Sequence, residues 1–157
     1  MISVINSDTL SDLSAAAKTS PRLRKNQNFH ASNESACHRL LNALEPGTYV
    51  QPHRHLDAEK DETMIALSGR FGVLIFDEAG EITEQAVLAA DGNLGINIPA
   101  GTFHSMVALE SGSVFFESKA GPYVPLGDSE KASWAPAEGE PGCEAYLAKM
   151  VAYFNIA

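Results

Sequence analysis

The sequence has few cysteines, few basic residues and no long hydrophobic run. Its two cysteines, Cys37 and Cys143, lie far apart in the chain, which argues against a disulfide framework and against a cysteine zinc site. No segment approaches the roughly 20 consecutive apolar residues that a membrane-spanning helix needs, so a membrane is not an expected partner. The first residues lack the basic and apolar stretches of a secretion signal, and we expect a cytoplasmic protein.

Acidic residues outnumber basic ones: the chain has 11 Lys and Arg against 20 Asp and Glu, a net charge of −9. A general nucleic-acid-binding protein needs a basic surface, so nucleic acid is not an expected partner. A small-molecule ligand, even an anionic one, is compatible with this charge because a pocket can be locally positive. The length of 157 residues and the 45% hydrophobic content suit one globular domain.

Short apolar or alternating segments separated by turns predict an all-β sandwich or barrel. The predicted strands are residues 39–44, 49–55, 63–67, 71–76, 82–88, 95–98, 104–109 and 113–119. We expect the last two strands to pair as a hairpin across residues 110–112.

Two helices are predicted at the ends of the chain. Ser7 or Asp8 can cap a short helix near the N-terminus. After Pro141, apolar residues recur at helical spacing and predict a terminal helix that packs on the barrel or on a second subunit. We therefore expect a single domain over 1–157. Its parts are an N-terminal helix and arm (1–35), a barrel (36–120), and an irregular segment followed by the terminal helix (121–157).

Two histidines at alternate positions of one predicted strand form the strongest candidate site. Side chains of a strand alternate between its faces, so His53 and His55 point the same way. Each imidazole offers a neutral ring nitrogen to a divalent cation. Glu62, at the head of the next strand, and His104, after a Pro-x-Gly turn, complete a predicted site of three imidazoles and one carboxylate.

Further polar residues are candidates for roles beside this site. Tyr49, His30 and Glu117 are candidate acid or base groups. Tyr49 shares the alternation of the two histidines, but core packing also explains it, and His30 also fits a structural or surface histidine. Arg22 and Arg24 belong to a basic segment that could fold over a pocket and bind phosphate or carboxylate. The same segment could instead stay solvated or pair with the chain's own carboxylates.

The two histidine-containing stretches together resemble the cupin superfamily. The first cupin motif, Gly-x5-His-x-His-x3–4-Glu-x6-Gly, is matched by Gly47, His53, His55, Glu62 and Gly69, except that six residues precede the glutamate. The second motif, Pro-x-Gly-x2-His-x3-Asn, is matched by Pro99, Gly101 and His104, with Ala108 at the last position. The resemblance implies a cupin double-stranded β-helix, a jelly-roll barrel, with a metal at its mouth.

A second carboxylate, Glu59, competes with Glu62 for the role of metal ligand, because it stands at the family's usual distance from His55. We expect Glu62 to be the ligand. It keeps the family's spacing to Gly69, and it borders an apolar strand, whereas Glu59 lies among charged residues.

Most of the chain between about residues 20 and 140 resembles one subfamily, the WbuC family of cupin-fold metalloproteins. The resembling segments are residues 20–24, 39–44, 46–50, 52–55, 98–102, 121–123 and 134–139. The family's name comes from bacterial surface-polysaccharide gene clusters. The resemblance therefore implies a sugar-related ligand and, together with the apolar terminal helix, a homodimer.

Imidazole and carboxylate ligands suit one divalent zinc, iron, manganese or nickel ion. Three functions remain open. The metal can act as a Lewis acid in the isomerisation or epimerisation of a sugar-related or carboxylated metabolite. Iron(II) would instead suit a dioxygenase-like oxidoreductase, and a closed site would suit a non-catalytic metal-binding or ligand-binding module.

Overall fold

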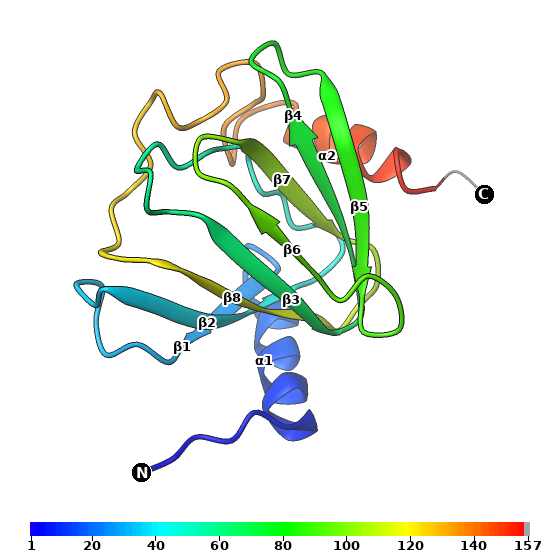
Figure 1. The fold of residues 1–157 in the computed structure, drawn as a ribbon. Coiled ribbons are helices and arrows are strands. Elements are labelled where there is room, and N and C mark those ends of the chain that lie inside the picture. The colour runs from blue at the N-terminus through cyan, green and yellow to red at the C-terminus, as the bar shows by residue number, and fades with distance from the viewer. Residues whose placement is uncertain (156–157) are drawn as a thin grey trace.

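The computed structural model describes residues 1–155, which form two antiparallel β-sheets with a helix on the outer face of each (Figure 1). The elements are α1 (Ser7–Thr19), β1 (Arg24–Asn28), β2 (Cys37–Leu44), β3 (Glu62–Ser68), β4 (Arg70–Phe76), β5 (Ile82–Ala89), β6 (Gly95–Ile98), β7 (Phe103–Ala108), β8 (Ser113–Ala120) and α2 (Cys143–Ala152). One sheet has the strand order β1-β2-β8-β3-β6, and the other has the order β5-β4-β7. No helix among the described residues is both long and apolar enough to cross a membrane.

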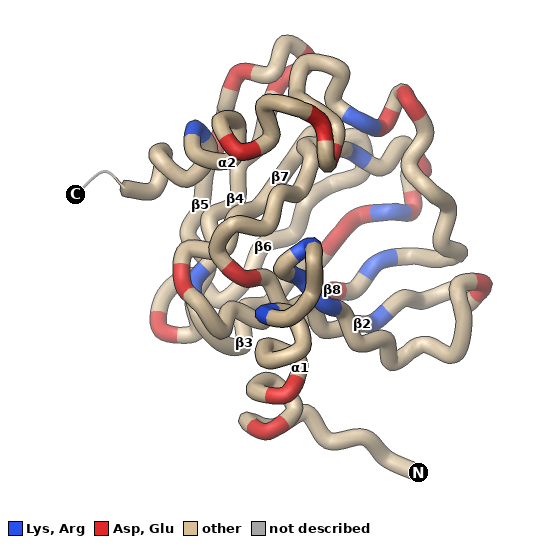
Figure 2. The backbone as a smooth tube through the Cα atoms, turned by 180° about the vertical axis from the view of Figure 1, so that it is seen from behind, with Lys and Arg blue, Asp and Glu red and all other residues tan. Residues whose placement is uncertain are grey.

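The inner faces of the two sheets enclose the main apolar core. Alternate residues of β3 and β4 point into it, so that Met64, Ala66, Phe71 and Val73 are buried in one cluster. Phe71 packs edge-to-face on Phe115, with ring centroids 5.1 Å apart. The acidic residues are spread widely along the backbone, on α1, around α2 and on the loops (Figure 2).

The chain passes from one sheet to the other at Gly69, between β3 and β4. Gly69 has a φ of 71°, a left-handed conformation that glycine adopts without steric cost. There is no room for a side chain, because an added Cβ would lie 2.5 Å from the Cα of Ser113. The Ser113 hydroxyl accepts a hydrogen bond from the Arg70 N–H at 3.0 Å, and this contact holds the corner together.

The predicted hairpin between residues 104–109 and 113–119 is wrong. β7 pairs with β4, whereas β8 lies in the other sheet between β2 and β3. The buried Glu45 carboxylate holds the connection, since it accepts hydrogen bonds from the Ser111 hydroxyl at 2.6 Å and from the Gly112 N–H at 2.9 Å. The turn residues show where the chain reverses but not which strand it then pairs with.

Both predicted terminal helices are present. The cap of α1 is Asn6 rather than the predicted Ser7 or Asp8, because the Asn6 side chain accepts a hydrogen bond from the Thr9 N–H at 3.0 Å. The apolar side of α1 packs on the outer face of β2 and β8. The apolar side of α2 packs on the outer face of β4 and β7, so the protein's own sheet covers this stripe.

Two segments near the barrel mouth differ from the predicted strands. Residues 24–28 form β1, an edge strand whose uniformly polar sequence gives no apolar alternation to predict it. The prediction of a strand over residues 49–55 is wrong, since only His53 forms isolated bridges, one of them to His104. Pro52 lacks an N–H, and the neighbouring backbone groups pair with two different segments, so no continuous ladder develops.

Candidate metal centre

The four predicted metal ligands, His53, His55, Glu62 and His104, lie together between the two sheets. Their donor atoms all lie within 4.8 Å of one another. Glu62 is the first residue of β3 and His104 is the second residue of β7, so each sheet contributes one of them. The two remaining histidines come from the extended segment before β3. The backbone of His53 is fixed against that of His104 by two hydrogen bonds of 3.0 and 2.9 Å.

Backbone carbonyls orient two of the imidazole rings. Nδ1 of His53 lies 2.9 Å from the Gln51 carbonyl, and Nδ1 of His104 lies 2.9 Å from the Thr102 carbonyl. A carbonyl oxygen only accepts hydrogen bonds, so each Nδ1 carries the proton. The Nε2 atom of each neutral ring therefore bears the lone pair that a metal ion needs.

Two buried polar atoms at the centre of the cluster face each other, and neither has a hydrogen bond of good geometry among the described residues. Nε2 of His104 and Oε2 of Glu62 are 2.7 Å apart; they form an ion pair when His104 is protonated, and they remain unpaired when the ring is neutral. Leaving such atoms unpaired is costly, and a cation that contacts both removes the cost. Three imidazoles and one carboxylate suit zinc, iron(II), manganese or nickel, so the residues present fit a divalent transition metal.

The protonation states of these groups follow from burial and from their neighbours. Burial, with a contribution from His104, lowers the pKa of His53 to about 3, so this ring is neutral at pH 7. Burial acts to raise the pKa of Glu62, but the two nearby imidazoles and the Lys119 ammonium bring it well below its usual range. Burial acts to lower the pKa of His104, but the Glu62 carboxylate raises it overall, so a proton competes with a metal ion there.

The structure places Glu62, and not Glu59, in the cluster. Glu62 is 2% exposed, and its Oε1 lies 3.0 Å from Nε2 of His55. Glu59 is exposed in the turn before β3, where its N–H donates a hydrogen bond to the Asp57 carboxylate at 3.0 Å.

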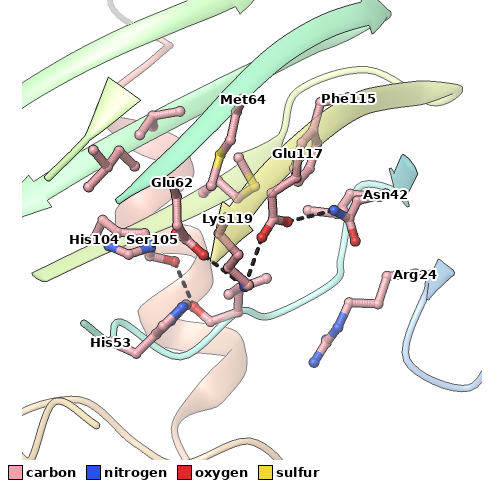
Figure 3. Close-up of a pocket in the computed structure, with 15 residues that line it drawn as sticks. Arg24, Asn42, His53, Glu62, Met64, His104, Ser105, Phe115, Glu117 and Lys119 are labelled. Atoms are coloured by element: carbon pink, nitrogen blue, oxygen red, sulfur yellow. Dashed lines mark hydrogen bonds and ion pairs between the residues drawn. The ribbon is translucent and has the colours of Figure 1, made fainter. Parts of the chain in front are cut away.

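A cavity of about 170 Å³ opens beside the cluster and is called the metal cavity below (Figure 3). Three of the four cluster residues, His53, Glu62 and His104, line it directly. Its apolar walls include Leu44, Met64, Val73, Ile98, Met106 and Phe115. Its polar wall, on the larger sheet, includes Arg24, Asn42, Glu117 and Lys119.

Glu117 and Lys119, both on β8, connect the cluster to the metal cavity. Lys119 Nζ lies 2.9 Å from Glu62 Oε1 and 2.8 Å from Glu117 Oε1 (Figure 3). Asn42 donates a hydrogen bond to the other Glu117 oxygen at 2.7 Å. Burial raises the pKa of Glu117, while the two carboxylates raise the pKa of Lys119 against the effect of its burial. Lys119 is not among the candidates from the sequence, although strand alternation places it on the same face as Glu117.

Tyr49 and His30, the other acid–base candidates, lie away from the metal cavity. The Tyr49 hydroxyl donates a hydrogen bond to the Pro136 carbonyl at 2.7 Å, and its ring packs in the apolar cluster beneath α2. Burial raises its pKa. Alternation fails to place this side chain because residues 49–55 are not a regular strand. His30 stacks on His38, with ring centroids 3.9 Å apart, beside a second cavity.

Arg22 and Arg24 share one carboxylate, that of Glu138. The two N–O distances are 2.6 and 2.7 Å. The hydrogen bond from Arg22 is the main cause that lowers the pKa of Glu138 to about 2. Arg24 also lines the metal cavity, whereas Arg22 is largely exposed. The pairing with the chain's own carboxylate that the sequence left open is therefore present, and Arg24 also faces the cavity.

Comparisons with known proteins give a family match and several similar folds. A sequence model described as "Domain of unknown function (DUF6016)" matches residues 5–88, and curated protein sequences give no match. The solved structure of KdgF from Halomonas sp. has a TM-score of 0.52 at 19% identity, covering 68% of this chain and 85% of that chain. A cupin superfamily protein from Desulfitobacterium hafniense has a TM-score of 0.52 at 12% identity, covering 69% and 86%. A conserved protein of unknown function from Streptococcus pyogenes has a TM-score of 0.53 at 15% identity, covering 79% and 91%.

These likenesses concern the fold. The fold is the all-β cupin jelly roll with short terminal helices that the sequence predicts, and one of these similar structures is described as a cupin superfamily protein. At such low identities the likeness assigns no role to any residue.

Proposed function

The chain belongs to the family described as Domain of unknown function (DUF6016), and we propose that it is a metal-dependent protein acting on a small polar metabolite. In this proposal His53, His55, Glu62 and His104 bind one divalent transition metal. The bound metal serves as a Lewis acid in an isomerisation or epimerisation.

The position of the cluster against the metal cavity carries this proposal. A metal that only braced the fold would be enclosed by its ligands. Here the donor atoms converge within 4.8 Å, and three of the four residues also form the cavity wall. A small molecule in the cavity therefore has direct access to the place where a cation would lie.

A divalent metal in this cluster supplies Lewis acidity, which polarises a carbonyl or hydroxyl oxygen of the ligand. The chain's own residues do the rest. We assign to Glu117 the removal of a proton from a ligand carbon, because it lines the metal cavity and Asn42 holds its carboxylate in place. Lys119 keeps a positive charge beside the cluster and can pair with a developing anion. Arg24 can pair with an acidic group on the ligand.

We further propose that the ligand is a sugar derivative and that the protein is a homodimer of WbuC type. The support is the resemblance of the seven segments between residues 20 and 139 to that family. Bacterial surface-polysaccharide metabolism is the corresponding proposed context. Sedimentation equilibrium tests the homodimer, which requires twice the chain mass of 16.8 kDa.

Manganese loading tests the open metal site. Protein loaded with Mn²⁺ should bind one ion per chain and enhance the relaxation of water protons, because an open coordination position lets solvent exchange. One bound ion without enhanced relaxation would mean a closed, structural site. Substrate-dependent uptake of dioxygen by iron-loaded protein would overturn the Lewis-acid assignment in favour of an oxidoreductase.

Hydrogen exchange tests the reaction class. A panel of aldoses and ketoses is incubated in D₂O with metal-loaded protein, and NMR follows the loss of the hydrogen beside the carbonyl group. We expect exchange with at least one sugar, and loss of that exchange in Glu117→Gln with metal content unchanged. Equal exchange in the wild type and in Glu117→Gln would remove Glu117 from the proposed role.

A further inference from the structure

A second cavity, of about 360 Å³, lies beside strands β1, β2 and β8 and is called the outer groove below. Its polar lining includes Asn26, Asn28, Asn33, His38, Lys119 and Tyr123. Lys119 also lines the metal cavity, so this one side chain borders both spaces. In Figure 1, β1 and β2 lie at one edge of the larger sheet, away from the three strands of the smaller sheet.

The strand register places the outer groove and the metal cavity on the same face of the larger sheet. Asn26 of β1 lies opposite Asn42 of β2, and His38 of β2 lies opposite Lys119 of β8. Side chains that lie directly opposite each other in a sheet share a face. Because Asn42 and Lys119 line the metal cavity, Asn26 and His38 extend the same surface outward.

The floor of the outer groove is rigidly built. The rings of His30 and His38 are buried and stack with centroids 3.9 Å apart and planes within 17°. Nε2 of His38 donates a hydrogen bond to the Asn33 carbonyl at 3.1 Å. Gly121 packs on the same ring, and a Cβ added there would lie 2.7 Å from it, so only glycine fits. Such a floor holds its shape without a ligand.

The rim of the outer groove offers hydrogen-bonding groups that are neutral, apart from Lys119. Asn26 donates a hydrogen bond to Asn28 at 2.8 Å, which orients the pair and leaves one amide oxygen and one amide nitrogen free at its ends. Tyr123 is largely exposed, at 56% relative exposure of the residue. Amides that both donate and accept match ligand hydroxyl groups, and an exposed ring matches the apolar face of a sugar ring.

We propose that the outer groove binds the second and later units of a polyhydroxylated, oligosaccharide-like ligand whose terminal unit lies in the metal cavity. The groove itself rests on the residues above, and only the position of the terminal unit rests on the proposed function. The protein then prefers oligosaccharides to the corresponding monosaccharides.

Side-chain amide signals test this binding. Zinc-loaded, ¹⁵N-labelled protein is titrated with mono-, di- and trisaccharides of glucose, galactose, mannose and N-acetylglucosamine in α and β linkages. At least one di- or trisaccharide should shift the Asn26 and Asn28 amide signals and bind about tenfold more tightly than its monosaccharide. A tenfold gain in affinity is what one or two additional hydrogen bonds contribute. A panel in which no member shifts these signals would overturn the proposal.

Strand β1 provides matched variants for the same titration. The double variant Asn26→Ala, Asn28→Ala should lose the tenfold preference and keep its zinc content. Gln27→Ala, on the opposite face of β1 and exposed, should keep both. If the double variant keeps the preference for oligosaccharides, the outer groove does not bind the later units of the ligand.

A variant of the metal site distinguishes failure of the proposed function from failure of the outer groove. In His53→Ala the outer groove should still show oligosaccharide-induced amide shifts after zinc is lost, because the mutated residue does not line it. Loss of the shifts in His53→Ala, in a protein that stays folded, would contradict an independent groove.

Discussion

Replacing Glu62 by Gln removes one negative charge from the centre of the cluster while keeping the size of the side chain. Glu62 is 2% exposed, and its carboxylate lies within 3.0 Å of two imidazole nitrogens and of the Lys119 ammonium. In Glu62→Gln the proposed metal site loses the one carboxylate among its four donor side chains. Lys119 keeps Glu117 as its remaining anionic partner at 2.8 Å, so the variant is expected to fold.

We expect the affinity of Glu62→Gln for Zn²⁺ to fall by at least about 100-fold, or about 2.8 kcal/mol. Changing a group that only supports a metal ligand typically costs 10- to 100-fold, and a charged ligand contributes more than such a group. Competition with a chromogenic chelator measures the dissociation constant, and circular dichroism verifies the fold.

Glu59→Gln is the matched control, because it makes the same chemical change on an exposed turn three residues earlier. Its affinity for Zn²⁺ should stay within about twofold of the wild type. An equal loss in both variants, or a larger loss in Glu59→Gln, would refute the assignment of Glu62 as the ligand.

Three further predictions concern the site, the sheet corner and acid stability. His104→Ala should retain less than about a tenth of the wild-type metal by elemental analysis, since it removes a ligand; full retention would exclude His104 from the site. Gly69→Ala should lower the free energy of unfolding by roughly 2 kcal/mol in urea titrations because its φ is 71° and Ser113 fills the space. Gly92→Ala, with open space around it, should change little, and equal effects would contradict this reasoning. The pKa of Glu138 is lowered from 4.5 to about 2, so its ion pairs stabilise the fold above about pH 4.5 and fade as the pH falls toward 2. Glu138→Gln should therefore lose less stability than the wild type between pH 5 and 2, by under about 1 kcal/mol given the 37% exposure of the Glu138 side chain. If the melting temperatures of the two proteins fall equally over this pH range, the ion pairs contribute nothing.

The sequence predicts the strands that carry apolar alternation, and it misses the one that does not. β3 and β4 are found because their inward residues are apolar and their neighbours form turns. β1 has the sequence Arg-Lys-Asn-Gln-Asn and is a strand only because β2 pairs with it. Two of its residues, Asn26 and Asn28, line the outer groove, so the least predictable strand contributes to a candidate binding surface.

The four-residue cluster is predictable from the spacing of its histidines and glutamate, whereas its surroundings depend on pairing between distant strands. Glu62 begins β3 and His104 lies in β7 just after a turn, but the strand expected over residues 49–55, which placed His53 and His55 on one face, does not form. Lys119 reaches Glu62 only because β8 pairs antiparallel with β3, a long-range choice that turn residues do not encode. The predicted position of Tyr49 differs from the structure for a related reason, since alternation applies only where a regular strand forms.

Anomalous X-ray diffraction from crystals of the metal-loaded protein tests the central claim most directly. We predict one anomalous peak per chain, about 2.0–2.2 Å from a nitrogen of each of the three histidines and from an oxygen of Glu62. If crystals grown with excess metal show no anomalous peak among these four side chains, or show the metal bound only at other residues, the account is contradicted.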